Sequence, residues 1–175
     1  FLDDLPFDPL RYGMPPKVRA SVEPLHLISL ETARLALEDA GYGQRPFCRE
    51  RTAIFMGISG SGDLGQFYGF RTMLPLFFGE QSTAISEHFA SVLPQWTEDS
   101  FPGILMNVAA GRIANRFDLG GANALVDAAC ASSLAALYLG VQEIESGGSD
   151  MALVGSADCM QNPFTYMCFS KTHAL

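Results

Sequence analysis

Residues Val126 to Leu137 read Val-Asp-Ala-Ala-Cys-Ala-Ser-Ser-Leu-Ala-Ala-Leu, and the character of the chain changes within this segment. The apolar stretch that leads into it, Ala122 to Val126, is typical of a buried strand. The small, alanine-rich run from Ala131 to about Ile144 is typical of a helix. The sequence therefore predicts a strand, a turn and a helix in succession, with Cys130 at the turn.

Cys130 is the candidate nucleophile of this chain. A cysteine at a helix start lies at the positive end of the helix, where unpaired backbone N–H groups and the macrodipole favour the thiolate. The thiolate is the reactive form of the side chain. The neighbours Ala128, Ala129 and Ala131 are small and leave room for a substrate. The alternative interpretation is a small buried cysteine that only fills space, which is common for free cysteines.

The rest of the chain alternates between strand-like and helix-like segments, which predicts an α/β protein with a largely parallel sheet. Irregular loops are expected over 1–16 and over the glycine-rich 57–65. Strands are expected over 52–58, 122–126 and 151–157. Helices are expected over 24–40, 82–92, 102–117 and 131–144, and 67–78 is expected to be a helix and then a loop because Pro75 interrupts it.

Composition excludes several classes of protein. The chain has 175 residues, enough for one domain, and its 48% hydrophobic and 17% charged residues indicate a folded protein. A net charge of −8 argues against a nucleic-acid surface, which needs clustered Lys and Arg. Arg112 and Arg116 lie four apart on one expected helix and could form a local basic patch, although a solvated helix face is the simpler interpretation.

The four cysteines, Cys48, Cys130, Cys159 and Cys168, do not form a metal-site pattern. None belongs to a Cys-x-x-Cys pair, and no histidine lies near them at metal-ligand spacing. The sequence also has no signal-peptide pattern and no apolar run long enough to cross a bilayer. Free thiols in a reducing, cytoplasmic setting are the simplest interpretation.

Gly60-Ser61-Gly62-Asp63-Leu64-Gly65 has the letters of the dinucleotide-binding motif G-x-G-x-x-G after an expected strand. Such a site also requires a second strand about 20 residues further on that ends in an acidic residue. The region from Leu74 to Glu87 has no clean strand. We therefore expect a tight, closely packed loop in preference to a nucleotide site.

The histidines are His26, His88 and His173, and a general base for Cys130 would have to be one of them if the chain were complete. His26 lies in an expected helix and should be partly exposed. His88 should lie on the surface, and His173 is near the end of the chain. We assign none of the three a catalytic role.

Other polar residues are expected to support the structure. Glu98 and Asp99 are adjacent, so a helix-capping or solvated role is favoured over a catalytic pair. Ser132 and Ser133 should satisfy the first turn of the helix after Cys130. Asp127 should anchor the turn itself.

The segment around Cys130 resembles the nucleophile motif of β-ketoacyl synthases, the condensing enzymes of fatty acid and polyketide assembly. Segments along nearly the whole chain resemble the same family. These are Phe7-Asp8-Pro9, Ser21-Val22-Glu23-Pro24-Leu25, Ala36-Leu37-Glu38-Asp39-Ala40-Gly41-Tyr42, Asn107 to Asn115 with Asp118-Leu119-Gly120-Gly121, and Asp150-Met151-Ala152-Leu153-Val154-Gly155.

Three features are similar to one branch of that family, the iterative synthases of the polyunsaturated fatty acid, enediyne and glycolipid type. Ala131 stands where modular polyketide synthases commonly have serine. Gln161-Asn162-Pro163-Phe164 and Cys168-Phe169-Ser170-Lys171-Thr172 also look like that branch.

The resemblance implies a thiolase-like fold, in which two similar α/β halves form five layers, α-β-α-β-α. Residues 1–175 would then be a partial β-ketoacyl synthase domain that covers most of the N-terminal half and is truncated at both ends. The family also implies a homodimer in which Ala122 to Val126 is an interface strand. The isolated fragment is expected to be inactive and to expose apolar surface.

The resemblance further implies decarboxylative Claisen condensation. Cys130 would attack an acyl thioester, with its own backbone N–H as an oxyanion donor. A malonyl unit on an acyl carrier protein would lose carbon dioxide, and the resulting enolate would attack the acyl group with the help of two histidines and a lysine outside this chain. No cofactor is bound directly, because phosphopantetheine on the carrier protein holds the substrates.

Two alternatives stay open at this point. One is a coenzyme A-dependent acyltransferase of the thiolase fold, which the residues around Cys130 disfavour. The other is a non-catalytic partner subunit like the chain-length factors, which usually lack the cysteine.

Overall fold

The computed structural model describes residues 6–158, 160 and 162–174. In this part of the chain one parallel sheet is formed by β1 (Thr52–Gly57), β2 (Asn123–Val126) and β3 (Met151–Ser156). The strand order is β2-β1-β3, so the first strand lies in the middle. The expected parallel sheet is confirmed, and all of its carboxyl ends point to one edge.

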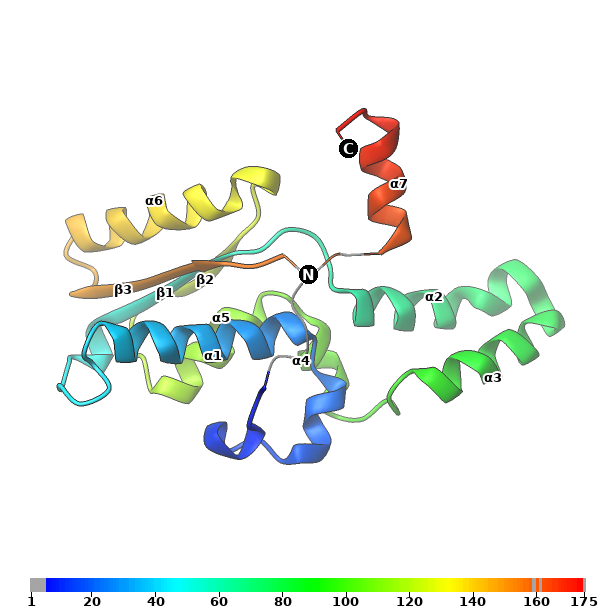
Figure 1. Cartoon of the computed structure of the whole chain (residues 1–175), viewed down its shortest axis with the longest axis horizontal. Coiled ribbons are helices and arrows are strands. Elements are labelled where there is room, and N and C mark those ends of the chain that lie inside the picture. The colour runs from blue at the N-terminus through cyan, green and yellow to red at the C-terminus, as the bar shows by residue number, and fades with distance from the viewer. Residues whose placement is uncertain (1–5, 159, 161, 175) are drawn as a thin grey trace.

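Helices cover both faces of this sheet (Figure 1). The helix α6 (Ser132–Glu145) lies on one face, and α1 (Pro24–Asp39) and α5 (Val108–Phe117) lie on the other. These elements form three layers, α/β/α. Such layering buries both faces of a parallel sheet, which explains why its central strand is buried throughout.

The central strand β1 divides the core into two parts. Ile54 and Met56 belong to the larger cluster under α1 and α5, whereas Ala53 and Phe55 pack with Ala136 of α6. The alternation follows from the two-residue period of a strand. All six residues of β1 are buried, and each large apolar side chain among them contributes about 1.5–3 kcal/mol through burial.

The remaining helices lie beyond the sheet. A helical hairpin, α2 (Asp63–Phe78) and α3 (Ser82–Val92), projects away from it, and α4 (Ser100–Ile104) and α7 (Pro163–Lys171) are short (Figure 1). Short 3₁₀ helices occupy Pro9–Tyr12, Pro16–Ser21, Arg49–Arg51, Gly79–Gln81 and Ala129–Ala131, here η1 to η5.

Two expected boundaries were wrong. The predicted single helix over 102–117 is two helices, α4 and α5, because Leu105 adopts an extended conformation (ψ 112°) between them. The helix α2 runs through Pro75, which was expected to end it. A proline in a helix interior removes one backbone hydrogen bond, and here it lies in the final turn, where that loss interrupts little of the helix.

Two segments are more ordered than the sequence suggested. The expected loop over 1–16 contains η1, whose start Asp8 caps, and buries Tyr12 and Met14 in the main core. The helix α7 was not predicted. Asn162 accepts a hydrogen bond from Thr165 N–H at its start, and Pro163 follows in the first helical position. Asparagine followed by proline is a usual start of a helix, but the apolar segment after it is too short for its periodicity to indicate a helix.

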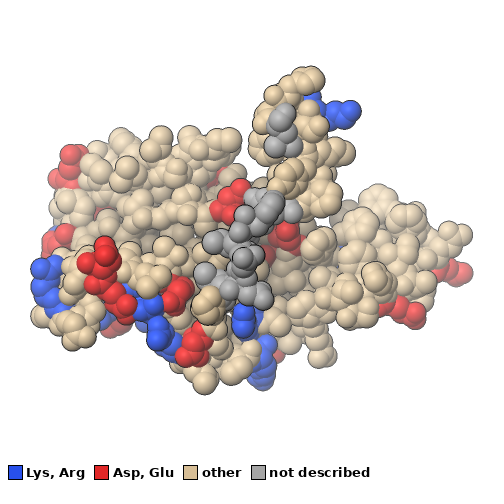
Figure 2. Space-filling view, viewed as in Figure 1, with Lys and Arg blue, Asp and Glu red and all other residues tan. Residues whose placement is uncertain are grey.

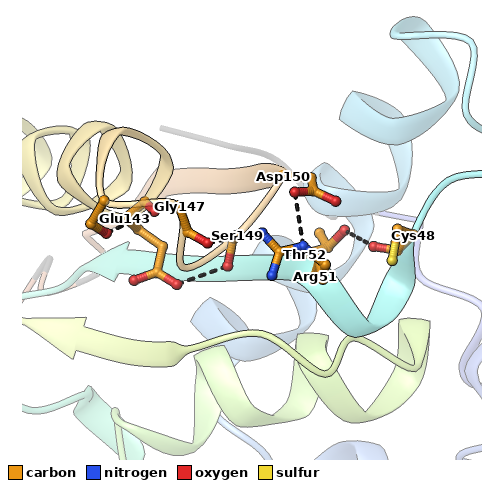
Figure 3. A network of polar contacts seen from close by, with 8 residues as sticks. Cys48, Arg51, Thr52, Glu143, Gly147, Ser149 and Asp150 are labelled. Carbon is orange, nitrogen blue, oxygen red and sulfur yellow. Dashed lines mark hydrogen bonds and ion pairs between the residues drawn. The ribbon is translucent and has the colours of Figure 1, made fainter.

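A polar network joins β1 and β3 at the amino end of the sheet (Figure 3). Arg51 Nε donates to Asp150 Oδ1 at 2.8 Å, and its Nη2 donates to the Gly147 carbonyl at 2.8 Å. Ser149 Oγ donates to Glu143 Oε1 at 2.8 Å, which ties the end of α6 to the same place. The network links the residues just before β1 to those just before β3 and lies at the opposite edge from Cys130.

Apolar side chains cover the outer face of α6. Figure 2 shows the charged side chains gathered over the α1 side, while the surface over α6, α2 and α3 carries few of them. On α6 the exposed fractions are 69% for Leu134, 51% for Leu137, 63% for Tyr138 and 43% for Val141. No helix in the described part of the chain is both long and apolar enough to span a bilayer.

Candidate active site

Cys130 lies in η5, after the carboxyl end of β2 and directly before α6. Its side chain is exposed. The predicted position at a strand-to-helix turn is therefore confirmed, and the alternative of a buried, space-filling cysteine is wrong. In open α/β sheets ligands bind outside the carboxyl ends of the strands, which is where this sulfur lies.

The residue before Cys130 has an unusual backbone. Ala129 has φ +49°, in the left-handed region that alanine rarely adopts. Such a conformation costs about 1–3 kcal/mol and persists only when its surroundings enforce it. Strained backbone of this kind clusters at functional sites, so the conformation of Ala129 supports the choice of this turn as the candidate site.

Two side chains hold this strained turn. Asp127 Oδ1 accepts a hydrogen bond from Ala129 N–H at 2.9 Å. Ser132 Oγ accepts from Ala128 N–H at 2.9 Å and donates to the Ala129 carbonyl at 2.7 Å. The expected anchoring role of Asp127 is confirmed. The hydrogen bonds enforce the backbone conformation that places Cys130.

The predicted helix-capping role of the two serines is wrong. The buried hydroxyl of Ser132 bonds backward to the turn, and Ser133 is exposed. Within the described residues no side chain caps the N-terminus of α6. The first-turn N–H groups of α6 are thus not consumed by a cap, which leaves a positive helix end beside the sulfur.

Asp127 also connects the turn to the glycine-rich loop. Its Oδ2 accepts a hydrogen bond from Gly60 N–H at 3.2 Å. The bonds from Ala129 N–H and then Gly60 N–H hold the pKa of Asp127 below its usual value, because both stabilise the ionised carboxylate. Asp127 is therefore charged at neutral pH and acts as an acceptor only.

The start of α6 lies directly on the carboxyl end of β1. A Cβ added at Gly57 would be closer to the backbone of Ser132 than van der Waals contact permits. Glycine at this position therefore lets the helix start approach the sheet, and with it the turn that carries Cys130.

The glycine motif begins as a closely packed loop, as expected, but the expected bounds were wrong, because its last three residues, Asp63, Leu64 and Gly65, form the first turn of α2. Glu23 Oε1 accepts a hydrogen bond from Gly65 N–H at 2.8 Å in the first turn of α2. A Cβ at Gly62 would overlap the Glu23 carboxylate. The carboxylate thus takes the place at the helix start that a nucleotide phosphate would need, and the nucleotide interpretation is not supported.

The histidines are placed as follows. His26 was expected to be partly exposed but is 1% exposed, because α1 packs against α5 and β3. Burial, and next the positive charge of Arg112, lowers the pKa of His26 to about 4. His88 is exposed, as expected, and so is His173. Among the described residues no recorded contact joins any of the three to Cys130.

The two arginines of α5 do not form a shared patch. Arg116 is exposed, whereas the Nε of Arg112 is buried and has no hydrogen-bond partner within the described ranges. Burial lowers the pKa of Arg112, and Arg116 adds to this effect. The expectation that Arg112 and Arg116 share one solvated helix face was therefore wrong for Arg112.

The acidic pair and the other cysteines are the last candidate groups of the chain. Asp99 precedes α4, but its side chain makes no cap bond in the described structure, and Ser100 Oγ instead accepts from Thr97 N–H at 2.9 Å. Cys48 and Cys168 are free and exposed. Cys159 and Gln161 lie outside the described residues. The described residues contain no group of three His, Cys, Asp or Glu suited to a metal ion.

Comparison with known proteins identifies the family. Residues 1–175 match the family described as "Beta-ketoacyl synthase, N-terminal domain", and the chain therefore belongs to that family. A ketosynthase from module 6 of the bacillaene synthase of Bacillus subtilis 168 is similar in structure, with a TM-score of 0.69 and 27% identity over 95% of this chain. The thiolase-like α/β fold is thereby confirmed.

The relatives are large proteins. The chain is 34% identical over 98% of its length to a polyunsaturated fatty acid synthase of Thraustochytrium sp.. It is 33% identical over its whole length to erythronolide synthase EryA2 of Saccharopolyspora erythraea. The chain spans 6% and 4% of these two proteins, and 24% of the bacillaene ketosynthase chain.

Proposed function

We propose that the chain is most of the first half of a condensing domain that forms carbon–carbon bonds by decarboxylative Claisen condensation. The observation that carries this proposal is the exposed Cys130 on a strained, hydrogen-bonded turn at the uncapped start of α6. Membership of the β-ketoacyl synthase family supports the reaction class.

In the first step, the Cys130 thiolate attacks the carbonyl carbon of an acyl thioester. A new C–S bond forms and the carbonyl oxygen gains negative charge. When the carbonyl re-forms, the C–S bond to phosphopantetheine breaks, and the departing thiolate takes a proton. The backbone N–H of Cys130, which lies in η5 just before α6, is the proposed donor to that oxygen. The product is an acyl-enzyme on Cys130, so the reaction is ping-pong.

In the second step, a malonyl thioester on an acyl carrier protein loses carbon dioxide. The electron pair of the broken C–C bond forms an enolate, which attacks the acyl carbon and expels the Cys130 sulfur. Two histidines and a lysine from outside residues 1–175 are proposed to stabilise the enolate. This chain contributes the nucleophile and its turn, and we propose that it binds no cofactor directly.

We also propose a homodimer that pairs through β2. This strand lies at one edge of the described sheet, and Asn123 and Ala124 are exposed along it. An exposed edge presents unpaired backbone groups that a second strand can use. The exposed thiols of Cys48, Cys130 and Cys168 support a reducing, cytoplasmic location.

The relatives do not separate the branches of the family, because identity to the polyunsaturated fatty acid synthase and to erythronolide synthase differs by little. We propose the iterative branch on the basis of Ala131 and of the segments around Asn162 and Cys168. The number of condensations by the complete protein tests this assignment.

The function is tested by condensation assays on the complete domain. Cys130→Ala should abolish product formation from acyl and malonyl carrier-protein substrates, while Cys168→Ala, which removes another exposed thiol, should retain it. Condensation by Cys130→Ala would refute the assignment. A preference for acyl-coenzyme A and free malonyl-coenzyme A in competition would favour the coenzyme A-dependent alternative instead.

A further inference from the structure

Glu23 is a buried carboxylate that the proposed reaction does not use. The residue is 1% exposed. It directly precedes α1, but its side chain does not cap that helix in the described structure. Its backbone N–H donates to the Gly103 carbonyl at 2.9 Å, which fixes the main chain from a second element. A buried carboxylate carries a large desolvation cost unless hydrogen bonds compensate for it.

The carboxylate instead caps a helix that begins 40 positions further along the chain. Glu23 Oε1 accepts from Gly65 N–H at 2.8 Å, in the first turn of α2. The start of a helix offers unpaired N–H groups and a partial positive charge. Gly62 leaves the space that the carboxylate fills, since any larger residue there would overlap it.

The same short loop reaches the nucleophile turn at its other end. Gly60 N–H donates to Asp127 Oδ2 at 3.2 Å, and Asp127 Oδ1 accepts from Ala129 N–H at 2.9 Å. Ala129 is the strained residue next to Cys130. The path from the buried carboxylate to the strained turn is therefore one loop and two hydrogen bonds at Asp127.

A third contact fixes the point where this loop ends and α2 begins. Asn162 Nδ2 donates to Asp63 Oδ1 at 2.6 Å, while Asn162 Oδ1 accepts from Thr165 N–H at 3.0 Å. Asn162 thereby joins the start of α2 to the start of α7. Residues 60–65, a short loop and the first turn of α2, are held by the residue before α1, by the residue before α7 and by the nucleophile turn. Within the described residues, Glu23 supplies the only buried carboxylate among these contacts.

We propose that Glu23 is a positioning residue for the nucleophile. Its carboxylate fixes the glycine loop so that Gly60 holds Asp127, and Asp127 holds the turn that presents Cys130. This inference rests on the proposed function, because it assumes that Cys130 is the nucleophile. It explains why a motif with phosphate-binding letters surrounds a carboxylate of the protein.

The test measures the alkylation rate of individual cysteines in the complete domain, by mass spectrometry after brief exposure to iodoacetamide. Cys48 and Cys168 are exposed and serve as internal references. Glu23→Ala should slow alkylation of Cys130 about threefold to tenfold relative to both references, the range expected for one hydrogen bond of ordinary net strength. Glu23→Gln keeps an acceptor oxygen and should restore the wild-type rate.

Glu31→Ala is the matched control for loss of stability alone. Glu31 also lies on α1, but it bonds to Tyr12 and Arg34, away from the loop. This variant should lower the melting temperature and leave the relative alkylation rate of Cys130 unchanged. An equal slowing in Glu31→Ala would show that general destabilisation explains the effect and would overturn the proposal.

A second variant covers the case in which Glu23→Ala does not fold. Gly62→Ala introduces a Cβ that overlaps the Glu23 carboxylate and should displace it, with the same selective slowing at Cys130. Unchanged Cys130 alkylation in a folded Gly62→Ala or Glu23→Ala domain would overturn the positioning role. If wild-type Cys130 is not alkylated with loss of condensation, the proposed function fails instead, which separates the two outcomes.

Discussion

Ala129 is the residue whose conformation the nucleophile turn depends on most. Its positive φ is unfavourable by about 1–3 kcal/mol in an L-residue other than glycine. Asp127 and Ser132 bond to its N–H and to its carbonyl. The strained residue and the hydrogen bonds that offset its strain lie next to Cys130. We therefore expect substitutions in this turn to change the position of the Cys130 side chain.

Ser132→Ala should destabilise the domain by about 1–3 kcal/mol, because it removes the hydrogen bonds to Ala128 N–H and to the Ala129 carbonyl, each of ordinary net strength. Ser133→Ala is the matched control, since Ser133 is exposed and should change stability by less than about 0.5 kcal/mol. Urea unfolding of the complete domain measures both. Equal midpoints for the two variants would contradict the backward bonding of Ser132.

Glu23→Gln should change how stability depends on pH. Burial raises the pKa of Glu23 above its usual value; Asp63 also raises it, while the Gly65 and Leu64 N–H groups oppose the shift. The folded carboxyl group therefore binds its proton more tightly than the unfolded one, and the wild type loses stability as pH rises through the raised pKa. Glutamine does not titrate, so the stability of Glu23→Gln relative to the wild type should rise from acid to neutral pH.

Unfolding of both proteins across that pH range measures the difference. The wild type and Glu23→Gln should respond alike below the ordinary glutamate pKa of about 4.3, where the carboxyl group is protonated in the folded and the unfolded chain. If the difference in stability between Glu23→Gln and the wild type did not change with pH, the raised pKa of Glu23 would be contradicted.

Some residue positions could be predicted from sequence and others could not. The place of Cys130 at the turn and the anchoring bonds of Asp127 were recognisable, because a cysteine between an apolar strand and an alanine-rich helix is an informative local pattern. Ser132 was assigned to the wrong partners, since a serine near a helix start can bond forward or backward with the same sequence. His26 was misjudged because its burial depends on the packing of α1 against α5 and β3, which are distant in sequence.

At the scale of elements, the approach of α6 to β1 determines where Cys130 lies. Helix and strand meet at Gly57, and within the sheet β1 lies between β2 and β3. The expected strands and the helices α1, α3 and α6 were recognisable from apolar periodicity. The break at Leu105 and the helix α7 were not, because both depend on local backbone bonding within apolar segments where periodicity carries little information.

Gly57→Ala should destabilise the domain by about 1–3 kcal/mol, as overpacking of a tight contact does, because its Cβ would overlap the Ser132 backbone. It should also slow alkylation of Cys130, since the start of α6 must shift. Gly69→Ala is the control: no atom lies within 4 Å of its added Cβ, and an alanine in the middle of α2 should stabilise by about 0.5–1 kcal/mol.

Thermal unfolding compares the two glycine variants directly. A lower melting temperature for Gly57→Ala and an unchanged or higher one for Gly69→Ala would agree with the structure. Tolerance of alanine at Gly57 would mean that the helix start does not lie against the strand as described.

At the scale of the whole molecule, the described chain has an apolar surface that soluble monomers rarely show. Leu134, Leu137 and Tyr138 are each more than half exposed on the outer face of α6, and Leu76 and Phe77 are similarly exposed on α2. A patch of this kind marks a surface that another part of a protein covers. We propose that the second half of the condensing domain covers it.

Residues 1–175 expressed alone should therefore associate or remain partly unfolded. Size-exclusion chromatography should give oligomers or aggregates, and a dye that binds apolar surface should bind more to this chain than to the complete domain. A monodisperse monomer with one cooperative melting transition would contradict the proposal that the α6 face is normally covered.

The central claim is that Cys130 carries the acyl group. The complete domain, incubated with an acyl carrier-protein substrate and no malonyl donor, should accumulate an acyl adduct, and peptide mass spectrometry should find it on the peptide that contains Cys130. Subsequent addition of the malonyl substrate should remove the adduct as product forms. An adduct on another residue, or one that persists in Cys130→Ala, would contradict the account.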